Sequence, residues 1–367
     1  MSDPRLAKWA QVIAEYSVEI RPGDRVFIHT SPIATPLVLE VVREVLQRGG
    51  YPQFIIDLPG VPEVFLKYAS AEQLKTEPPL MKKAIEEFDV RIRIRAETNT
   101  KALSNTDPHK LAMYTAAQGM TPTFMRRQAS GELRWCVTLF PTQAYAQDAE
   151  MSLHEYEEFV FGACLLNDPD PVASWKAVAA RQQVLVDWLK GKQRIHVKGP
   201  NCELTVGIDG RTFINADGRK NFPDGEIFTG PEETITDGWV RFTYPAIYQG
   251  REVEGVELEF KSGRIVKAGA KKGEDFLVRM LDTDAGARVL GEFAIGTNYS
   301  IQKFTREILF DEKIGGSIHM AVGAGYPETG SKNKSAVHWD LICDTRDGTQ
   351  ITVDGVPFYR GGEFLVK

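Results

Sequence analysis

A histidine and an aspartate stand two positions apart in an apolar run near the C-terminus, as His338-Trp-Asp340 within residues 336–343. Alternate residues of a β-strand project from one face, so an extended conformation here places the two polar side chains side by side. A buried carboxylate without a partner costs several kcal/mol, so Asp340 requires a cation or a strong hydrogen-bond donor. The tripeptide alone leaves two interpretations open, a metal site or a structural ion pair in the core.

Two further ionisable residues lie in apolar runs, His319 within residues 317–322 and Glu292 within residues 289–295. A single histidine in such a run is more often a hydrogen-bonded core residue, and the glutamate could equally face water from an edge strand. Beyond residue 196, however, His319 and His338 are the only histidines, and both lie in apolar runs. This coincidence favours metal ligation over two unrelated core histidines.

Glu226, within residues 223–228, and Glu312, within residues 310–313, lie among polar residues, where spacing alone indicates surface carboxylates. Carboxylates together with neutral imidazoles are the ligands that Zn²⁺, Co²⁺ and Mn²⁺ take in proteins. The abundance of carboxylates favours two ions about 3.5–4 Å apart, an arrangement that activates water for hydrolysis of an amide or a phosphate. The chemistry indicated is therefore two-metal hydrolysis.

Motifs of other enzyme classes are absent from the sequence. It contains no HExxH, no GxSxG, no Walker A loop, and no GxGxxG after the first expected strands. These absences argue against a zincin, a serine hydrolase, a P-loop protein and a dinucleotide-binding protein. The formal net charge of −6 and the pI near 5.7 argue against a nucleic-acid partner, which requires a basic face.

The four cysteines are far apart and never form a CxxC pair, so the sequence predicts neither a zinc knuckle nor a disulfide framework. The N-terminus leads into an amphipathic pattern rather than an apolar one, and no run approaches the roughly 18 apolar residues of a membrane span. We expect a cytoplasmic protein with no membrane partner.

The elements that must position these residues divide the 367-residue chain into two expected domains. Residues 1–188 predict an open α/β domain, because a helical pattern at 6–16, a strand at 25–29, a helix at 36–48 and a strand near 54–57 form a βαβ-like unit.

Residues 189–367 predict an α+β domain with a mixed or antiparallel sheet that carries the metal site. One helix is expected at 274–281. The expected strands are short and lie at residues 194–198, 203–208, 240–244, 256–260, 265–268, 317–322, 336–344 and 350–353.

Over nearly its whole length the sequence resembles the aminopeptidase T, AmpS and PepS family of dinuclear metallo-aminopeptidases. In the N-terminal half the matching segments are Tyr16-Ser-Val-Glu-Ile-Arg-Pro-Gly-Asp24 and the stretch from Phe140-Pro-Thr-Gln to Met151-Ser-Leu. In the C-terminal half they are Phe222-Pro-Asp-Gly-Glu-Ile-Phe228, Tyr248-Gln-Gly-Arg-Glu-Val-Glu254, Leu290-Gly-Glu-Phe293, Leu309-Phe-Asp-Glu312, His319, Gly325-Tyr-Pro-Glu328 and His338-Trp-Asp340. The C-terminal segments are the more specific ones.

The resemblance implies a metal-dependent aminopeptidase that acts on peptides with a free N-terminus, with two divalent ions (Zn, Co or Mn) per chain and a homodimeric assembly. The metal ligands that it implies are Glu226, Glu292, Glu312, His319, His338 and Asp340. It also implies that Glu292 and Tyr326 are catalytic, with Tyr326 near the scissile carbonyl, where a phenol can donate a hydrogen bond to an oxyanion. Without the resemblance, Tyr326 would be interpreted as a turn residue before Pro327.

Two alternatives stay open at the level of sequence. The same ligand set would serve a two-metal hydrolase of other small amides or of phosphoesters, because the ligands determine how water is activated but not which substrate is cleaved. A two-domain binding protein with merely structural buried carboxylates and histidines is the non-enzymatic alternative.

Overall fold

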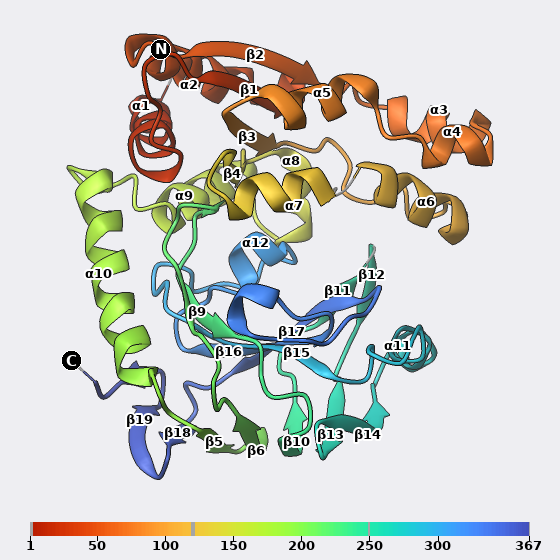
Figure 1. Ribbon diagram of the computed structural model, residues 1–367, viewed down its shortest axis with the longest axis vertical. Helices are drawn as coiled ribbons and strands as arrows, with labels where there is room; N and C mark the ends of the chain where they lie inside the picture. The colour runs from red at the N-terminus through yellow and green to blue at the C-terminus, as the bar shows by residue number, and fades with distance from the viewer. Residues whose placement is uncertain (1–2, 119–121, 249, 367) are drawn as a thin grey trace. The chain divides into compact units, whose positions relative to one another are not determined.

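The computed structural model describes residues 3–118, 122–248 and 250–366. The chain divides into two compact units, of which unit 1 comprises Met1–Trp175 with Gly218–Pro223, and unit 2 comprises Lys176–Asp217 with Asp224–Lys367 (Figure 1). Gln249, which belongs to the family-like segment 248–254, lies outside the described residues.

Unit 1 is built on a parallel sheet. Its strands are β1 (Arg25–Thr30), β2 (Tyr51–Ile56), β3 (Val90–Arg95), β4 (Arg134–Leu139) and β8 (Asn221–Phe222). They lie in the order β2-β1-β3-β4-β8, and each is parallel to its neighbours. This sheet confirms the prediction of an open α/β fold in the N-terminal half.

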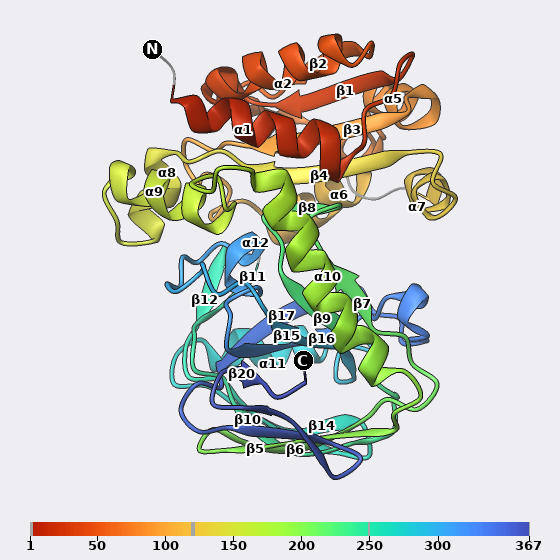
Figure 2. The ribbon, with the colours of Figure 1, turned by 90° about the vertical axis from the view of Figure 1, so that its left-hand side faces the viewer.

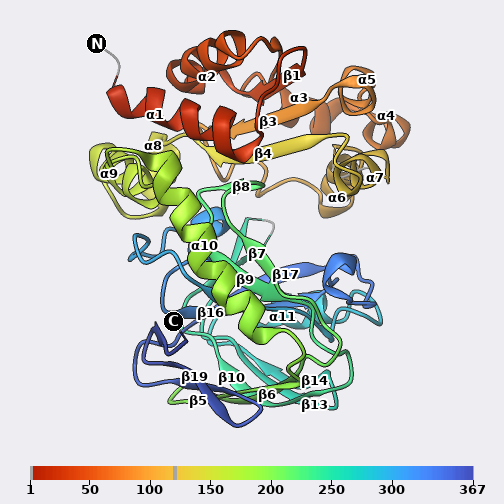
Figure 3. The ribbon, with the colours of Figure 1, turned by 60° about the vertical axis from the view of Figure 1, so that its left-hand side comes forward.

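Helices cover both faces of the parallel sheet. They are α1 (Pro4–Val12), η1 (Ile13–Ser17), η2 (Pro32–Ala34), α2 (Thr35–Gln47), α3 (Val61–Tyr68), α4 (Ala71–Lys75), α5 (Pro79–Glu87), α6 (Pro108–Gln118), α7 (Pro122–Ala129), α8 (Gln143–Asp148) and α9 (Leu153–Ala163). On one face Trp9 of α1 donates its indole hydrogen to Thr138 of β4 at 3.2 Å. On the other, Phe27 of β1 packs with Ile85 of α5 and Phe124 of α7. Figure 3 shows α1 on one side of the sheet and α5 and α7 on the other.

Helix α10 (Pro171–Leu189) begins in unit 1 and continues into unit 2, so the expected boundary at residue 188 falls near its end. Unit 2 contains two larger antiparallel sheets and a β-hairpin. The shorter of the two sheets consists of β7 (Ile214–Ala216), β9 (Glu226–Thr229), β15 (Leu290–Gly296), β16 (Ser317–Gly323) and β17 (His338–Asp344), in the order β17-β16-β15-β9-β7.

The longer sheet consists of β5 (Arg194–Gly199), β6 (Cys202–Gly207), β10 (Thr236–Arg241), β13 (Glu257–Lys261), β14 (Arg264–Gly269), β18 (Gln350–Val353), β19 (Val356–Arg360) and β20 (Glu363–Phe364). The hairpin is formed by β11 (Ala246–Tyr248) and β12 (Arg251–Val253), and the helices are α11 (Glu274–Leu281), α12 (Ile308–Asp311) and η3 (Pro327–Thr329). The antiparallel prediction for the C-terminal half is therefore confirmed.

The two larger sheets of unit 2 pack face to face around one apolar core (Figure 2). Val197 and Val206 come from the longer sheet, and Ile318, Met320 and Leu341 come from the shorter one. Because side chains alternate along a strand, the residues between these core positions point to the opposite face of the shorter sheet. No helix in residues 3–118, 122–248 or 250–366 is long and apolar enough to cross a membrane.

Candidate metal centre

Five of the predicted site residues lie on neighbouring strands of the shorter sheet. Glu226 begins β9, Glu292 lies on β15, His319 lies on β16, and His338 and Asp340 lie on β17. His319 follows Ile318 and precedes Met320, which are both core residues, so its ring projects from the face turned away from the core. That face therefore collects the polar side chains of four strands.

A β-bulge gives Glu292 its direction. Regular alternation would place it on the same face as Leu290, which belongs to the apolar core. The register between β15 and β16 shifts between Leu290 and Glu292, and Phe293 then takes the next core position. A Cβ at Gly291 would lie 2.3 Å from the carbonyl oxygen of Ala324, so glycine is required at the bulge.

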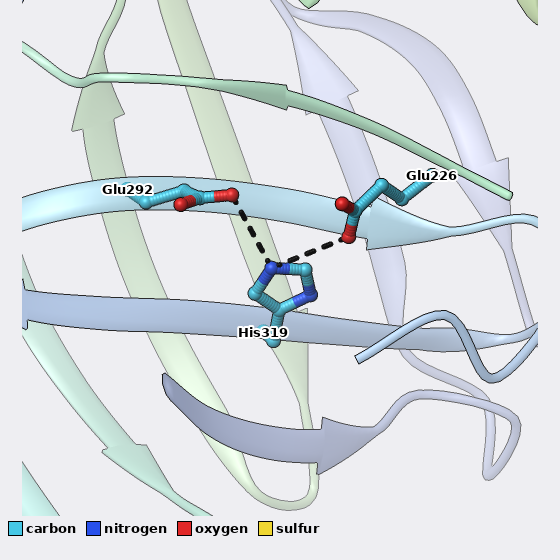
Figure 4. Close-up of side chains that lie close together, drawn as sticks. All are labelled: Glu226, Glu292 and His319. Carbon is cyan, nitrogen blue, oxygen red and sulfur yellow. Dashed lines mark hydrogen bonds and ion pairs between the residues drawn. The ribbon is translucent and has the colours of Figure 1, made fainter. Parts of the chain in front are cut away.

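His319 faces two carboxylates at nearly equal distances. Its Nε2 atom lies 3.4 Å from Oε2 of Glu226 and 3.4 Å from Oε1 of Glu292 (Figure 4). His338 repeats the pattern, because its Nε2 atom lies 3.5 Å from Oε2 of Glu292 and 3.7 Å from Oδ1 of Asp340. These separations are longer than ordinary N–H···O hydrogen bonds and suit ligand atoms that share a cation.

Backbone carbonyls fix both imidazole rings from behind. Nδ1 of His319 donates to the carbonyl of Glu312 at 2.9 Å, and Nδ1 of His338 donates to the carbonyl of Ala324 at 2.8 Å. A carbonyl only accepts hydrogen bonds, so each Nδ1 carries a hydrogen, and Nε2 is the ring nitrogen that faces the carboxylates and is left to serve as a metal ligand. Histidines that bind metals are oriented in this way.

Glu312 approaches the cluster from outside the sheet, directly after α12. Its carboxylate lies with ligand atoms of His319 and Asp340 in a group whose atoms are all within 4.8 Å of one another. Two other such groups are Glu226 with Glu292 and His319, and Glu292 with His338 and Asp340. The structure thus brings together all six residues expected to be metal ligands.

Burial and neighbouring charges shift the pKa values of three cluster residues, Glu226, His319 and His338. Burial raises the pKa of the Glu226 carboxyl well above its ordinary value. Burial also disfavours the charged form of His319, but attraction to Glu226 and Glu292 outweighs this and raises the pKa of the imidazole to about 10. His338 behaves alike, since attraction to Asp340 and Glu292 outweighs burial and raises its pKa. The shifts of the two histidines reflect the negative carboxylates that surround them.

The donor set fits divalent metal ions. Oε2 of Glu226 is buried and accepts no hydrogen bond from the described residues, so a buried polar oxygen is left unsatisfied. Carboxylate oxygens and imidazole nitrogens converge at separations that direct hydrogen bonds do not explain. Zn²⁺, Co²⁺ and Mn²⁺ are the ions that take this mixture of carboxylate and imidazole ligands.

Tyr326 lies beside the cluster and not within it. Its ring contacts the His338 ring edge to face at a centroid distance of 5.2 Å, and the Phe228 ring at 5.6 Å. The side chain is 37% exposed, so it remains reachable from solvent. Desolvation of the phenol, with the negative charges of Glu292 and Asp340, raises its pKa, so the hydroxyl stays protonated as a hydrogen-bond donor.

Two charged residues of the cluster were not predicted from the sequence, Lys313 and Asp224. Lys313 is fully buried, pairs with Glu312, and lies 4.0 Å from Asp224. Residues 310–313 combine two acids and a lysine, as an exposed helical turn commonly does, so the sequence contains no signal for this burial.

The sequence pattern of the thermophilic metalloprotease family (M29) matches residues 2–364. The chain belongs to this family. The M29 match spans both units and includes every residue of the cluster described above.

Relatives of this M29 chain align over nearly its whole length. Aminopeptidase 2 of Geobacillus stearothermophilus is 28% identical, with 100% of this chain and 98% of the relative covered. Aminopeptidase T of Thermus aquaticus is 28% identical, with 98% of each chain covered. The solved structure of wild-type AmpT from Thermus thermophilus has a TM-score of 0.85 at 24% identity and covers 99% of both chains, which supports the fold.

Proposed function

We propose that this protein is a metal-dependent aminopeptidase that removes N-terminal residues from peptides. The observation that carries the proposal is the convergence of Glu226, Glu292, His319, His338 and Asp340 on one sheet face. Membership of a metalloprotease family and full-length relatives that are named aminopeptidases support the same activity.

Two divalent ions per chain fit the ligand groups best. Glu292 belongs to two groups, one with Glu226 and His319 and the other with His338 and Asp340, so its two oxygens can serve neighbouring ions. Oε1 of Glu292 faces His319 and Oε2 faces His338, so this carboxylate would offer one oxygen to each of the two positions. Zinc, cobalt or manganese suits this mixture of oxygen and nitrogen donors.

Bound ions of this type supply a Lewis acid and a water of lowered pKa for attack on a peptide carbonyl. The protein's own residues orient the reaction. The carbonyls of Glu312 and Ala324 hold the two histidine rings in place. Tyr326, protonated and partly exposed beside His338, can donate its hydroxyl hydrogen to the carbonyl oxygen as negative charge develops there.

The wider setting is also a proposal. We infer that residues 189–367 form the catalytic domain and residues 1–188 a separate N-terminal domain. The cluster and its supporting carbonyls all belong to unit 2, which supports this division. We further propose a cytoplasmic homodimer, in keeping with the four buried free cysteines and with the family resemblance.

Activity on matched peptides tests the proposal. The protein, loaded with Zn²⁺, Co²⁺ or Mn²⁺, is expected to release the first residue of short peptides and of aminoacyl-arylamides. N-acetylated versions of the same peptides are expected to stay intact, because the blocked amine is neutral and no longer a ligand. Equal turnover of free and acetylated peptides would contradict exopeptidase action, and hydrolysis of phosphoesters alone would favour the other two-metal hydrolase.

A further inference from the structure

Lys313 is a fully buried lysine, and it stands among carboxylates of the candidate metal centre. Its ammonium group forms an ion pair with Oε1 of Glu312 and lies 4.0 Å from Oδ1 of Asp224. It also interacts electrostatically with Glu226. A buried ammonium is costly, so its carboxylate partners must hold it in place.

The backbone fixes Lys313 beside Asp224. The amide of Asn298 donates to the carbonyl of Lys313 at 3.1 Å, and the side-chain amide of Asn298 donates to the carbonyl of Asp224 at 2.9 Å. One asparagine thus ties both segments together. Gly225 has a φ of +123° and packs against Asn298, where a Cβ would lie 2.7 Å from the Asn298 Cβ. The backbone of Lys313 is therefore held beside that of Asp224, and its buried ammonium lies 4.0 Å from Oδ1 of Asp224.

The positive charge of Lys313 is distributed unevenly over the cluster. Its charge partners Glu312 and Glu226 belong to the groups completed by His319. The group of Glu292, His338 and Asp340 contains none of its partners. A metal ion near Glu226 and Glu312 would therefore compete with the Lys313 ammonium for Glu312. The same ammonium would also repel the ion.

We propose that Lys313 is a positioning residue that makes the two cation positions unequal: it holds Glu312 and weakens cation binding at the position beside His319, the residue that the groups of Glu226 and Glu312 share, while the Glu292–His338–Asp340 position stays strong. This rests on the metal-centre part of the proposed function. The weaker ion is then the exchangeable one, and its occupancy follows the free metal concentration.

Metal titration of the full chain tests the inference. The protein is freed of metal with a chelator, and Zn²⁺ or Mn²⁺ is added in a calorimeter, with bound metal counted after gel filtration. The wild type is expected to bind two ions in steps that differ in Kd by about tenfold or more. In Lys313→Met, which keeps the apolar stem and removes the charge, the weaker step is expected to tighten by about tenfold while the stronger step stays within about threefold.

Lys272→Met is the matched control. Lys272 also belongs to unit 2 and pairs with glutamates, Glu254 and Glu252, but its side chain is 64% exposed and neither partner belongs to the ligand groups. The same loss of one charge is expected to leave both steps unchanged there. Lys313→Arg, which keeps the charge, is expected to keep the two steps unequal.

The Lys313→Met protein could fail to fold without metal, because the carboxylate of Glu312 loses its cationic partner. A comparison of two further variants keeps the test valid in that case. Glu312→Gln is compared with Glu312→Gln/Lys313→Met, which removes both members of the ion pair. The second change is expected to tighten the weaker step by about tenfold in this background as well. Two ions bound with the same affinities in every Lys313 variant would overturn the inference and leave the metal centre standing. Absence of metal binding in the wild type would overturn both.

Discussion

His29 in unit 1 and His319 in unit 2 both lie on strands beside carboxylates, and their surroundings differ in charge. Nε2 of His29 lies 2.9 Å from Oδ1 of Asp57, and Oδ2 of the same aspartate lies 2.7 Å from Arg93. The aspartate is therefore neutralised by a fixed arginine. Burial lowers the pKa of His29, so its ring is neutral at physiological pH.

Around His319 the balance is reversed. Two carboxylates face one Nε2 atom, and the buried ammonium of Lys313 is paired with Glu312 instead of with Glu292. Nδ1 of His319 is anchored by a backbone carbonyl, whereas Nδ1 of His29 has no hydrogen-bond partner among the described residues. Two features therefore distinguish the proposed ligand His319 from the structural His29. Two carboxylates face Nε2 of His319, and its Nδ1 is held by a backbone carbonyl.

The strongest test of this contrast removes a proposed ligand. Asp340→Asn and His338→Ala are each expected to abolish peptidase activity at ordinary metal concentrations, because loss of a ligand should exceed the roughly 10- to 100-fold cost of losing an outer partner. Circular dichroism is expected to show a retained fold, and excess Co²⁺ or Zn²⁺ should restore part of the activity. Full activity in both variants would move the catalytic site elsewhere.

Tyr326→Phe separates catalysis from metal binding. The change removes one hydrogen-bond donor beside His338 and is expected to lower kcat by about 100-fold with metal content unchanged. Steady-state kinetics on an aminoacyl-arylamide and metal analysis of the same sample provide the measurement. A near-normal kcat would return Tyr326 to the role of a turn residue.

Metal removal should affect stability as well as activity. At metal concentrations about 100 times the Kd, bound ions stabilise the folded chain by about 2.7 kcal/mol, which corresponds to a melting temperature about 5 °C or more higher. Chelation is therefore expected to lower the Tm of the wild type and of His29→Ala equally. If the Tm of both proteins is the same with and without chelator, the cluster binds no ion.

His29→Ala is the counterpart in unit 1 and has the smallest expected effect on function. Loss of its packing and of the hydrogen bond to Asp57 is expected to cost about 1–3 kcal/mol of unfolding free energy. Because burial lowers the pKa of His29 in the folded state, the unfolded chain binds the proton more readily below pH about 6.5. The stability contribution of the histidine is thus complete above that pH, and the difference between wild type and variant should narrow at pH 5.5 in denaturant titrations.

Period-two alternation was enough to predict that His338 and Asp340 share a strand face, and β17 has that geometry. It was not enough for Glu292, because the bulge at Gly291 reverses the direction that simple alternation gives. Glu226 and Glu312 were expected only through the family resemblance. Their neighbours in the sequence are polar and indicate surface positions, whereas the burial arises from tertiary packing.

The larger fold was predictable where patterns were regular. The open α/β half and the antiparallel half follow from helical and alternating apolar spacing. The expected strand at 240–244 is displaced, because β10 runs from Thr236 to Arg241 and includes Gly238. A Cβ at Gly238 would lie 2.0 Å from the carbonyl oxygen of Glu203, so this glycine allows the close approach of β10 to β6.

A metal centre on this face of the shorter sheet is tested by the number of divalent ions bound per chain, counted by elemental analysis after dialysis against a fixed excess of Zn²⁺. The wild type and His29→Ala are expected to hold two ions each, and Asp340→Asn and His338→Ala fewer, with all four proteins folded. Equal metal content in all four, or none in the wild type, would contradict a metal centre at this sheet face.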